Sequence, residues 1–205
     1  MTIFLNRLAT YRHLSFERGE PTMDRTRDQL LDEYLVAAAR LGDRKAFDLL
    51  ARRWGRKLVA HAWRLTGDVD QAREAAQDGW IEIVRGLGRL RDERAFPAWA
   101  YQIVTRRCAR RIGRARRDRA LAAAAAAEPV FAPDAPDTAD PGATARLRIA
   151  LAALPEAQRA AVGLFYLEDL GVADVAIALN VPAGTVKTRL MHARRALRAV
   201  LEGDE

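Results

Sequence analysis

The sequence predicts an all-α protein made of two small helical domains, an N-terminal helical bundle and a C-terminal domain that contains a helix-turn-helix. Apolar residues recur at spacings of three and four over 28–119 and again over 146–202, which is the period of an amphipathic helix. The stretch between them, 120–145, is rich in Ala, Pro and acidic residues, so we expect a flexible linker there. No stretch shows the alternating pattern of a β-strand.

Two helices are predicted after a flexible N-terminal extension at 1–27, in which Met23 offers an alternative start. The first helix ends at Gly42, and Asp43 is placed to cap the second, which ends at Gly67. The apolar stripe of the first helix consists of Leu30, Leu31, Tyr34, Leu35, Ala38 and Leu41. The stripe of the second consists of Phe47, Leu50, Trp54, Leu58, Ala62 and Leu65.

Asp68 is placed to cap a third helix, which is followed by a charged loop at 88–95. A fourth helix is predicted from Phe96 to about Arg117, and its residues 106–119 include eight arginines and one aspartate. Because these arginines fall on all sides of the helix, we expect this end to face solvent or a polyanion. The stripe of the third helix consists of Ala72, Ala76, Trp80, Ile83, Val84 and Leu87.

The C-terminal unit is predicted to begin near Arg146, and Pro155 opens a further helix that contains Val162. Residues 172–198 fit two short helices joined by a tight turn. Asn180 suits the turn because Asn tolerates the left-handed conformation, and Pro182 suits the start of the second helix. The first helix carries Val175, Ala176 and Leu179 on one face, and the second carries Val186, Leu190, Ala193, Leu197 and Val200.

The second helix of this pair is basic on the side away from its apolar stripe, where Lys187, Arg194, Arg195 and Arg198 lie. Its entry at 182–185 has small side chains, which let a helix N-terminus approach a phosphate or a base edge. A basic face is often only a solvated face, but a helix packed on one side and cationic on the other indicates a DNA-reading helix-turn-helix.

The composition favours a polyanionic partner, because the net charge is +7 and the pI is near 10.3. Cys108 is the only cysteine, so we expect no internal disulfide, and no Cys/His cluster offers a zinc site. We expect no metal, cofactor, signal peptide or membrane-spanning helix, and a cytoplasmic location. No glycine-rich phosphate loop or catalytic triad is present, so an enzyme is not expected.

Several short motifs resemble the extracytoplasmic-function (ECF) sigma factors, the smallest bacterial transcription-initiation subunits. In the C-terminal unit these are Ala-Leu-Pro-Glu at 153–156, Tyr-Leu-Glu at 166–168 and Gly-Thr-Val-Lys-Thr-Arg-Leu at 184–190. In the N-terminal unit they are Gly42-Asp43, Ala46-Phe47, Gly67-Asp68, Gln77-Asp78 followed by Trp80, and Phe96-Pro97-Ala98-Trp99. The sequence departs from the family at Arg107, where asparagine is frequent, and at Gly79, Glu82 and the Ala75-Ala76 pair, where bulkier or basic residues are usual.

The resemblance implies that residues 28–119 are similar to sigma region 2 and residues 146–202 to sigma region 4. For duplex minus-35 DNA it implies contacts by Ala183, Gly184, Thr185, Lys187, Thr188, Arg189, His192, Arg194 and Arg195. For the melted minus-10 element it implies contacts by Trp99, Arg106, Arg107, Arg110, Arg111 and Arg114. We expect the Trp99 side chain, however, to be packed inside the protein and the arginines to contact DNA. For core RNA polymerase it implies Gln77, Asp78, Trp80 and Ile81.

The same resemblance implies three further features of the complex. The loop 88–95 would receive an extruded base, and the acidic linker would thread the polymerase channel near the RNA path. An anti-sigma factor is an expected partner, whereas a small-molecule substrate is not. All chemistry would belong to the polymerase.

Two other classes of protein compete with this interpretation. A helix-turn-helix transcriptional regulator that does not dock on polymerase would explain residues 146–202 but would leave the N-terminal domain and the linker without a role. A sigma-like decoy that titrates an anti-sigma factor would need no DNA-binding charge, and the arginines at 106–119 argue against it.

Overall fold

The computed structural model describes residues 26–123 and 149–202, and within those ranges it contains helices and turns but no strand, which confirms the all-α prediction. The expected extension at 1–27 lies almost wholly outside the described residues, as does most of the expected linker at 120–145. In chain order the elements are α2 (Arg27–Arg40), α3 (Arg44–Thr66), α4 (Val69–Gly86), η1 (Leu87–Arg89), η2 (Glu93–Ala95), α5 (Phe96–Ala123), helical residues 149–153, α7 (Glu156–Val162), the π-helical turn η3 (Gly163–Leu167), α8 (Val172–Leu179) and α9 (Ala183–Glu202).

Side-chain caps fix where the first helices begin. Asp43 accepts hydrogen bonds from the backbone N–H groups of Lys45 and Ala46, at 2.8 and 3.2 Å, and Asp68 accepts one from Gln71 at 2.8 Å. Both predicted caps are therefore confirmed. Such caps satisfy N–H groups that have no partner inside the helix.

The buried face of α2 differs from the predicted stripe. Leu35 and Val36 are buried together with Asp32, whereas Tyr34 is 67% exposed and Leu41 is 91% exposed. The physical reason is an ion pair, because a carboxylate oxygen of Asp32 accepts a hydrogen bond from Nε of Arg53 on α3 at 2.8 Å. This contact turns the helix so that a charged residue occupies part of its inner face.

Helices α2–α5 form one bundle, which we call the N-terminal bundle, and its core follows the predicted stripe of α3 closely. Leu50, Trp54, Leu58 and Ala62 are all buried there. Helices α4 and α5 approach very closely at Gly79, where a Cβ atom would lie 2.8 Å from Cγ2 of Val104. The glycine that departs from the family pattern is therefore required by packing.

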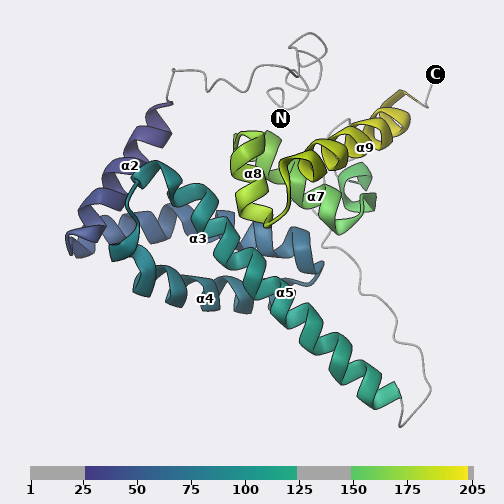
Figure 1. The fold of residues 1–205 in the computed structure, drawn as a ribbon, viewed down its shortest axis with the longest axis horizontal. Helices are drawn as coiled ribbons and strands as arrows, with labels where there is room; N and C mark the ends of the chain where they lie inside the picture. The colour runs from purple at the N-terminus through teal and green to yellow at the C-terminus, as the bar shows by residue number, and fades with distance from the viewer. Residues whose placement is uncertain (1–25, 124–148, 203–205) are drawn as a thin grey trace.

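The helical residues after 148, with α7–α9, form a C-terminal bundle that packs against the first. Helix α8 lies against α5, and α7 and η3 lie against α3, so the buried hydrophobic cluster is continuous through both bundles. The C-terminal part of α5 projects beyond the other helices (Figure 1). The arginines considered below lie on α5 and on α9.

Candidate nucleic-acid interface

The turn between α8 and α9 has the geometry of a tight helix-turn-helix connection. Asn180 takes the left-handed conformation at φ 53°, as its side chain predicts. The backbone N–H of Val181 donates to the carbonyl of Ala176 at 3.0 Å, which closes the end of α8. The carbonyl of Pro182 then accepts from the N–H groups of Thr185 and Val186, at 2.9 and 3.2 Å, and starts α9.

One face of α9 is held in the core of the C-terminal bundle. Val186, Leu190, Ala193 and Leu197 are each at most 2% exposed, which confirms these four members of the predicted stripe. The side chain of Val200, the fifth member, lies outside the described part of the chain. On α8 the fully buried face is Val175, Ala178 and Leu179, whereas Ala176 is half-buried. The opposite face of α9 therefore points away from the core of the C-terminal bundle.

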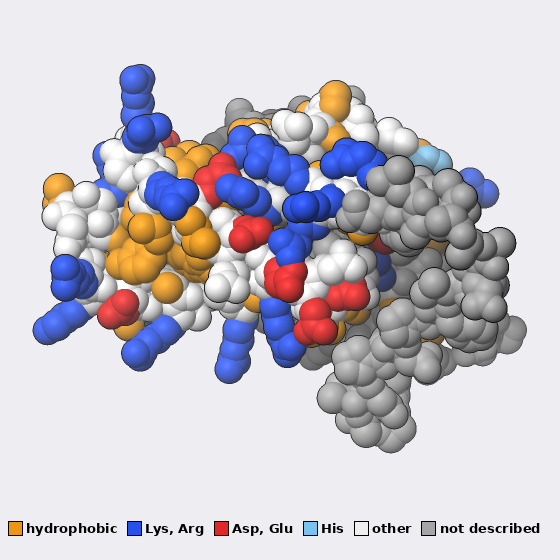
Figure 2. Space-filling model, turned by 90° about the horizontal axis from the view of Figure 1, so that it is seen from below, with side chains coloured by type: hydrophobic (Ala, Val, Ile, Leu, Met, Phe, Trp, Pro, Cys, Tyr) orange, Lys and Arg blue, Asp and Glu red, His pale blue; other side chains and the backbone are white. Residues whose placement is uncertain are grey.

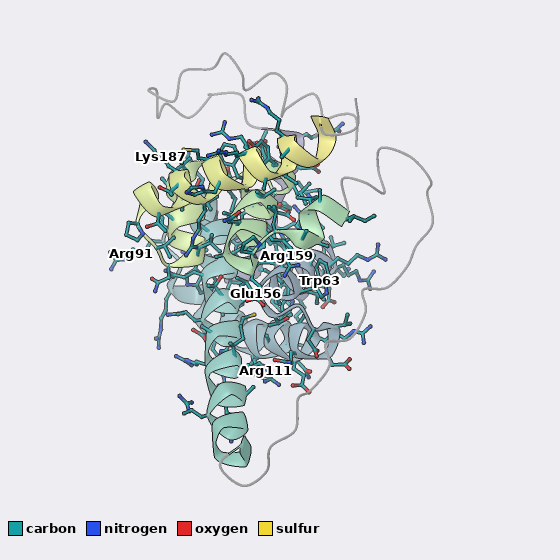
Figure 3. All side chains as sticks on the ribbon, turned by 90° about the vertical axis from the view of Figure 1, so that its right-hand side faces the viewer. Trp63, Arg91, Arg111, Glu156, Arg159 and Lys187 are labelled. Carbon is teal, nitrogen blue, oxygen red and sulfur yellow. The ribbon has the colours of Figure 1, made fainter. Side chains whose placement is uncertain are left out.

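This opposite face carries the residues predicted to contact duplex DNA. Thr188 donates its hydroxyl hydrogen to the carbonyl of Gly184 at 3.0 Å, and Nε of Arg194 donates to the carbonyl of Leu190 at 3.4 Å. Lys187 is exposed near the N-terminal end of the helix (Figure 3). Of the predicted set, the exposed members are Ala183, Gly184, Lys187, Thr188, His192 and Arg195, and the half-buried members are Thr185, Arg189 and Arg194.

Gly184 stands in open space at the N-terminal end of α9. A Cβ atom added there would meet no other atom within 4 Å, and its φ is not in the left-handed region. Neither packing nor backbone conformation therefore requires glycine at this position. The absence of a side chain leaves room for another molecule to approach the first N–H groups of the helix.

The arginines of α5 divide into two groups. Arg106 and Arg107 both donate to the carboxylate of Glu82, and Arg111 donates to Asp78 at 3.2 Å and also pairs with Glu74. The acids stand at a spacing of four on α4 and face α5. The expectation that this end of α5 meets only solvent or a polyanion is therefore wrong for these three arginines. Arg110, Arg114 and Arg117 are exposed and pair with no residue that the structure describes.

Trp99 and the loop 88–95 lie at the N-terminal end of α5. Trp99 is half-buried and packs over Gly86, where a Cβ atom would lie 2.8 Å from its ring, and its ring centroid is 6.2 Å from that of Phe96. The loop forms the turns η1 and η2, and Asp92 accepts a hydrogen bond from the N–H of Arg94 at 3.0 Å. Its exposed side chains include Arg91 (Figure 3).

An exposed apolar groove runs between α3 and α4, and we call it the α3–α4 groove. Ile81 is 47% exposed and Val84 is 55% exposed, although the predicted stripe placed Val84 in the core. Trp80 is half-buried, and its ring packs edge to face with that of Phe47, with 6.1 Å between the ring centroids. Figure 2 shows apolar side chains gathered on this face beside a row of acidic and basic ones. The groove is lined by Phe47, Ala51, Gln77, Trp80, Ile81 and Val84.

Three of the four predicted polymerase-binding residues line this groove, and the fourth faces another helix. Gln77, Trp80 and Ile81 line the groove, whereas Asp78 faces α5 and pairs with Arg111. Sequence reasoning did not find the partners Glu74 and Glu82 or the exposure of Val84. The sequence does contain a pattern that could have indicated these ion pairs. The acids of α4 are spaced by four residues, as are Arg107 and Arg111 on α5.

Two titratable groups in the core of the N-terminal bundle have strongly shifted pKa values. Burial lowers the pKa of His61 to about 3, with a further contribution from the charge of Arg64, and its Nε2 is 2.8 Å from the hydroxyl of Thr105. Burial raises the pKa of the Cys108 thiol to about 12. Within the described ranges no group of three His, Cys, Asp or Glu residues is placed to hold a metal ion. None of the described helices is long and apolar enough to cross a membrane.

Comparison with known proteins finds a family match for part of each bundle. Residues 50–118 match the family model of Sigma-70 region 2, and residues 144–197 match that of Sigma-70, region 4. The chain is 36% identical over 175 residues to the ECF RNA polymerase sigma factor SigM of Mycobacterium tuberculosis, covering 85% of this chain and 87% of that protein. It is 31% identical over 181 residues to the RNA polymerase sigma-H factor of Pseudomonas aeruginosa, covering 83% and 94% of the two chains.

Solved structures show the same fold. CnrH, solved in complex with the cytosolic domain of CnrY, matches with a TM-score of 0.57 and 23% identity, covering 85% of this chain and 99% of that one. The sigma factor RpoE of Bartonella quintana, solved with the anti-sigma factor NepR, matches with a TM-score of 0.62 and 22% identity, covering 78% and 99%. Together with the sequence relatives, these matches show that the chain belongs to the ECF family of RNA polymerase sigma factors.

Proposed function

We propose that this sigma factor directs core RNA polymerase to promoters through two DNA contacts and one protein contact, each made by a different surface. Residues 28–119 act as region 2, residues 146–202 act as region 4, and residues 120–145 link them. The partners are core RNA polymerase, duplex minus-35 DNA and the melted minus-10 element. The catalytic step of transcription belongs to the polymerase, and the protein acts in the cytoplasm.

Helix α9 reads the minus-35 element in the major groove. Its buried stripe fixes the helix, and its N-terminal turn carries the small residues Ala183 and Gly184, which allow close approach. Thr185, Lys187 and Arg189 follow on the outward side and supply contacts to base edges or phosphates. Arg194 and Arg195 lie farther along the helix, where they suit phosphate contacts.

Helix α5 and the loop 88–95 hold the melted minus-10 element. The exposed arginines Arg110 and Arg114 contact phosphates directly, because the structure describes no acidic partner for either. Arg106, Arg107 and Arg111 lie beside them but are held by acids of α4. The loop receives an extruded base, and Trp99 supports the start of the helix by packing over Gly86.

The α3–α4 groove docks on the polymerase. It exposes apolar surface from Ile81, Val84 and Trp80, and exposed apolar surface of this kind is typical of protein interfaces. Gln77 lies at the groove and supplies a polar contact. An anti-sigma factor is a further proposed partner, because RpoE, which shares the fold, was solved with one.

The observation that carries this proposal is that one chain exposes both a helix-turn-helix with a cationic face and an apolar groove on a separate bundle. A DNA-binding regulator that acts alone needs only the first of these surfaces. The test is run-off transcription with purified core polymerase, this protein and a promoter library. We expect initiation from a defined subset of promoters.

The matched variants are Ile81→Asp, in the groove, and Leu41→Asp, at an exposed apolar position outside it. Ile81→Asp should abolish binding to core polymerase while duplex minus-35 binding is kept, and Leu41→Asp should behave as the unmodified protein does. Duplex binding without any initiation by the unmodified protein would favour the regulator instead.

A further inference from the structure

The first half of α2 is apolar on two opposite faces, and only one of them is covered by described residues. Leu35 and Val36 are buried, whereas Leu30 is 50% exposed, Leu31 is 41% exposed and Tyr34 is 67% exposed. Tyr34 follows Leu30 by four residues and Leu31 by three, so these three side chains share one face of the helix. We call Leu30, Leu31 and Tyr34 the outer α2 patch.

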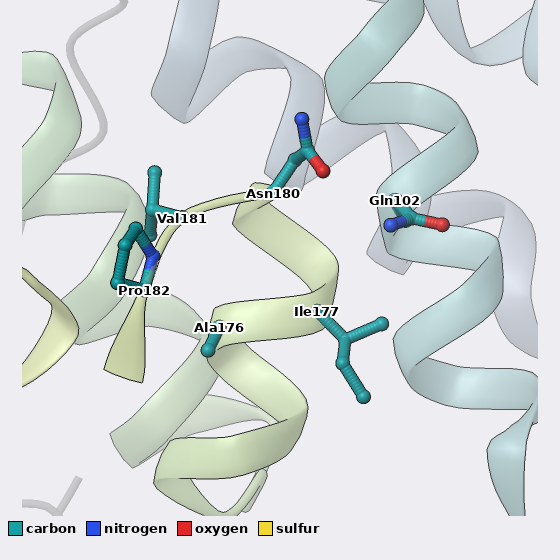
Figure 4. Close-up of a pocket in the computed structure, with 6 residues that line it drawn as sticks. All are labelled: Gln102, Ala176, Ile177, Asn180, Val181 and Pro182. Atoms are coloured by element: carbon teal, nitrogen blue, oxygen red, sulfur yellow. The ribbon is translucent and has the colours of Figure 1, made fainter. Parts of the chain in front are cut away.

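The outer α2 patch is separate from the hollows on the rest of the described surface. It shares no residue with the α3–α4 groove. It also shares none with the open cleft between Gln102 on α5 and the turn after α8, in which Ile177 forms the facing wall (Figure 4). Because exposed apolar patches commonly mark surfaces that another segment or molecule covers, the patch requires an occupant of its own.

The size of the patch favours a tethered occupant over a free partner. Three partly exposed side chains offer on the order of a few hundred Å², whereas each partner in a stable complex contributes about 800 Å². A segment of the same chain needs less surface, because a short tether gives it an effective concentration in the millimolar range. Helix α2 begins directly after Thr26, so the residues before Thr26 are tethered next to the patch.

The sequence of residues 1–25 supplies suitable apolar side chains. Phe4, Leu8 and Tyr11 follow one another at spacings of four and three, within a stretch that runs from Ile3 to Leu14. The 11 residues 15–25 remain as the tether, and a chain of that length spans about 18 Å on average. The patch begins about 6 Å along α2 from Thr26, so the tether is long enough.

Charge favours the same pairing. Residues 1–16 include Arg7 and Arg12 and contain no acidic residue. Asp28 stands one helical turn before Leu31 at the edge of the patch, and its side chain is 84% exposed. Attraction between such exposed charges contributes little affinity, but it favours one orientation of the segment on α2.

We propose that residues 3–14 dock on the outer α2 patch through Phe4, Leu8 and Tyr11, and so extend the N-terminal bundle. This inference does not depend on the proposed function. A chain that starts at Met23 lacks the segment and leaves the patch exposed.

The first experiment traps the docked segment with a disulfide. Leu8→Cys and Leu31→Cys are introduced together into the full-length protein, in which native Cys108 is buried. Mild oxidation with diamide at micromolar protein concentration should form a disulfide within one chain. Adding Phe4→Ser and Tyr11→Ser should slow its formation at least fivefold, because the tether is unchanged while the apolar contacts are lost.

Asn6→Ser and Thr10→Ser provide the matched control in the same cysteine pair. Both positions fall on the opposite side of the Phe4, Leu8 and Tyr11 spacing, so the rate should be that of the parent pair. Equal rates in the two sets of serine variants would overturn the proposal, because the tether alone would then bring the cysteines together. A disulfide between two chains would also overturn it, in favour of a second copy as the occupant.

The second experiment removes the segment. The chain that starts at Met23 should bind anilinonaphthalene sulfonate with at least twofold higher fluorescence than the full-length protein, because the dye binds exposed apolar surface. Leu30→Ser with Tyr34→Ser should remove this gain, and circular dichroism verifies that the proteins fold. Unchanged dye fluorescence in the shortened chain would contradict docking. Loss of core polymerase binding in that chain, with equal cross-linking rates in the serine sets, would assign the patch to the polymerase instead.

Discussion

Glu82 holds Arg107 through two hydrogen bonds, in which Nε and Nη2 donate to the same carboxylate oxygen at 3.0 and 2.6 Å. The other oxygen accepts from Arg106 at 2.8 Å. Arg107 and Glu82 are two of the positions at which this sequence departs from the pattern of its family. The structure shows that they form one interaction between α4 and α5. Arg107, which stands where the family frequently has asparagine, is therefore paired with the acidic side chain of Glu82.

The first prediction concerns this pair. Glu82→Gln and Arg107→Asn should each destabilise the protein by about 1 kcal/mol or less, because both side chains are about 30% exposed and solvent screens the attraction. The double variant should be destabilised by less than the sum of the two, with a coupling of about 0.5 kcal/mol. Urea unfolding of the four proteins measures this coupling. Strictly additive effects would show that the contact contributes nothing.

The second prediction separates the two groups of arginines on α5. Arg110→Ala and Arg114→Ala should each reduce the salt dependence of holoenzyme binding to forked minus-10 DNA, by about 0.7 in the slope of log K against log salt for each phosphate that is no longer neutralised. Arg106→Ala is the control, because its guanidinium already pairs with Glu82. An equal change in slope for Arg106→Ala would mean that the acids of α4 do not hold the arginine back from DNA.

The third prediction follows from His61. Its folded-state pKa, near 3, lies below the usual value of 6.5, so the unfolded chain binds more protons between these two pH values. The stability associated with neutral His61 is fully present above about pH 6.5. It should decline by about 1.4 kcal/mol per pH unit as the pH falls below that value toward 3.

His61→Gln should flatten this part of the stability profile, measured by urea unfolding at successive pH values down to about 4.5, above most carboxylate titration. The control is His192→Gln, at an exposed position on α9, which should keep the slope of the parent protein. If His61→Gln retains the full slope, the buried imidazole is not its source.

The local signals in the sequence were sufficient for most of the fold. The caps Asp43 and Asp68 and the four described members of the stripe of α9 depend on neighbours within one or two helical turns, and these were predicted correctly. Asn180 in the turn belongs to the same group, because its left-handed conformation follows from its own side chain.

The differences arise where partners come from distant parts of the chain. The inner face of α2 contains Asp32 because Arg53 meets it, and hydrophobic periodicity alone treats such a residue as solvent-facing. Val84 has the spacing of a core residue but lies at an open groove, since no described helix covers that side of α4. These positions depend on which helices lie side by side, and hydrophobic periodicity within one helix does not reveal its neighbours.

The last prediction concerns Gly184, where the requirements of folding and of DNA binding diverge. Because a Cβ atom there meets nothing within 4 Å, Gly184→Ala should leave the free energy of unfolding unchanged or raise it by up to about 1 kcal/mol, as alanine favours the helix. The larger Gly184→Leu should fold equally well. Both should weaken binding to a minus-35 duplex, the leucine variant by about tenfold or more, which is about 1.4 kcal/mol.

Fluorescence anisotropy with the duplex measures the binding, and thermal unfolding measures the stability of the same samples. Ala196→Leu provides the control, because it adds the same bulk at an exposed position farther along α9 and should leave the affinity unchanged. The decisive comparison is between the two leucine variants at equal stability. Equal affinities would show that DNA does not approach the N-terminal end of α9, and the minus-35 contact would then have to be placed on another part of the helix.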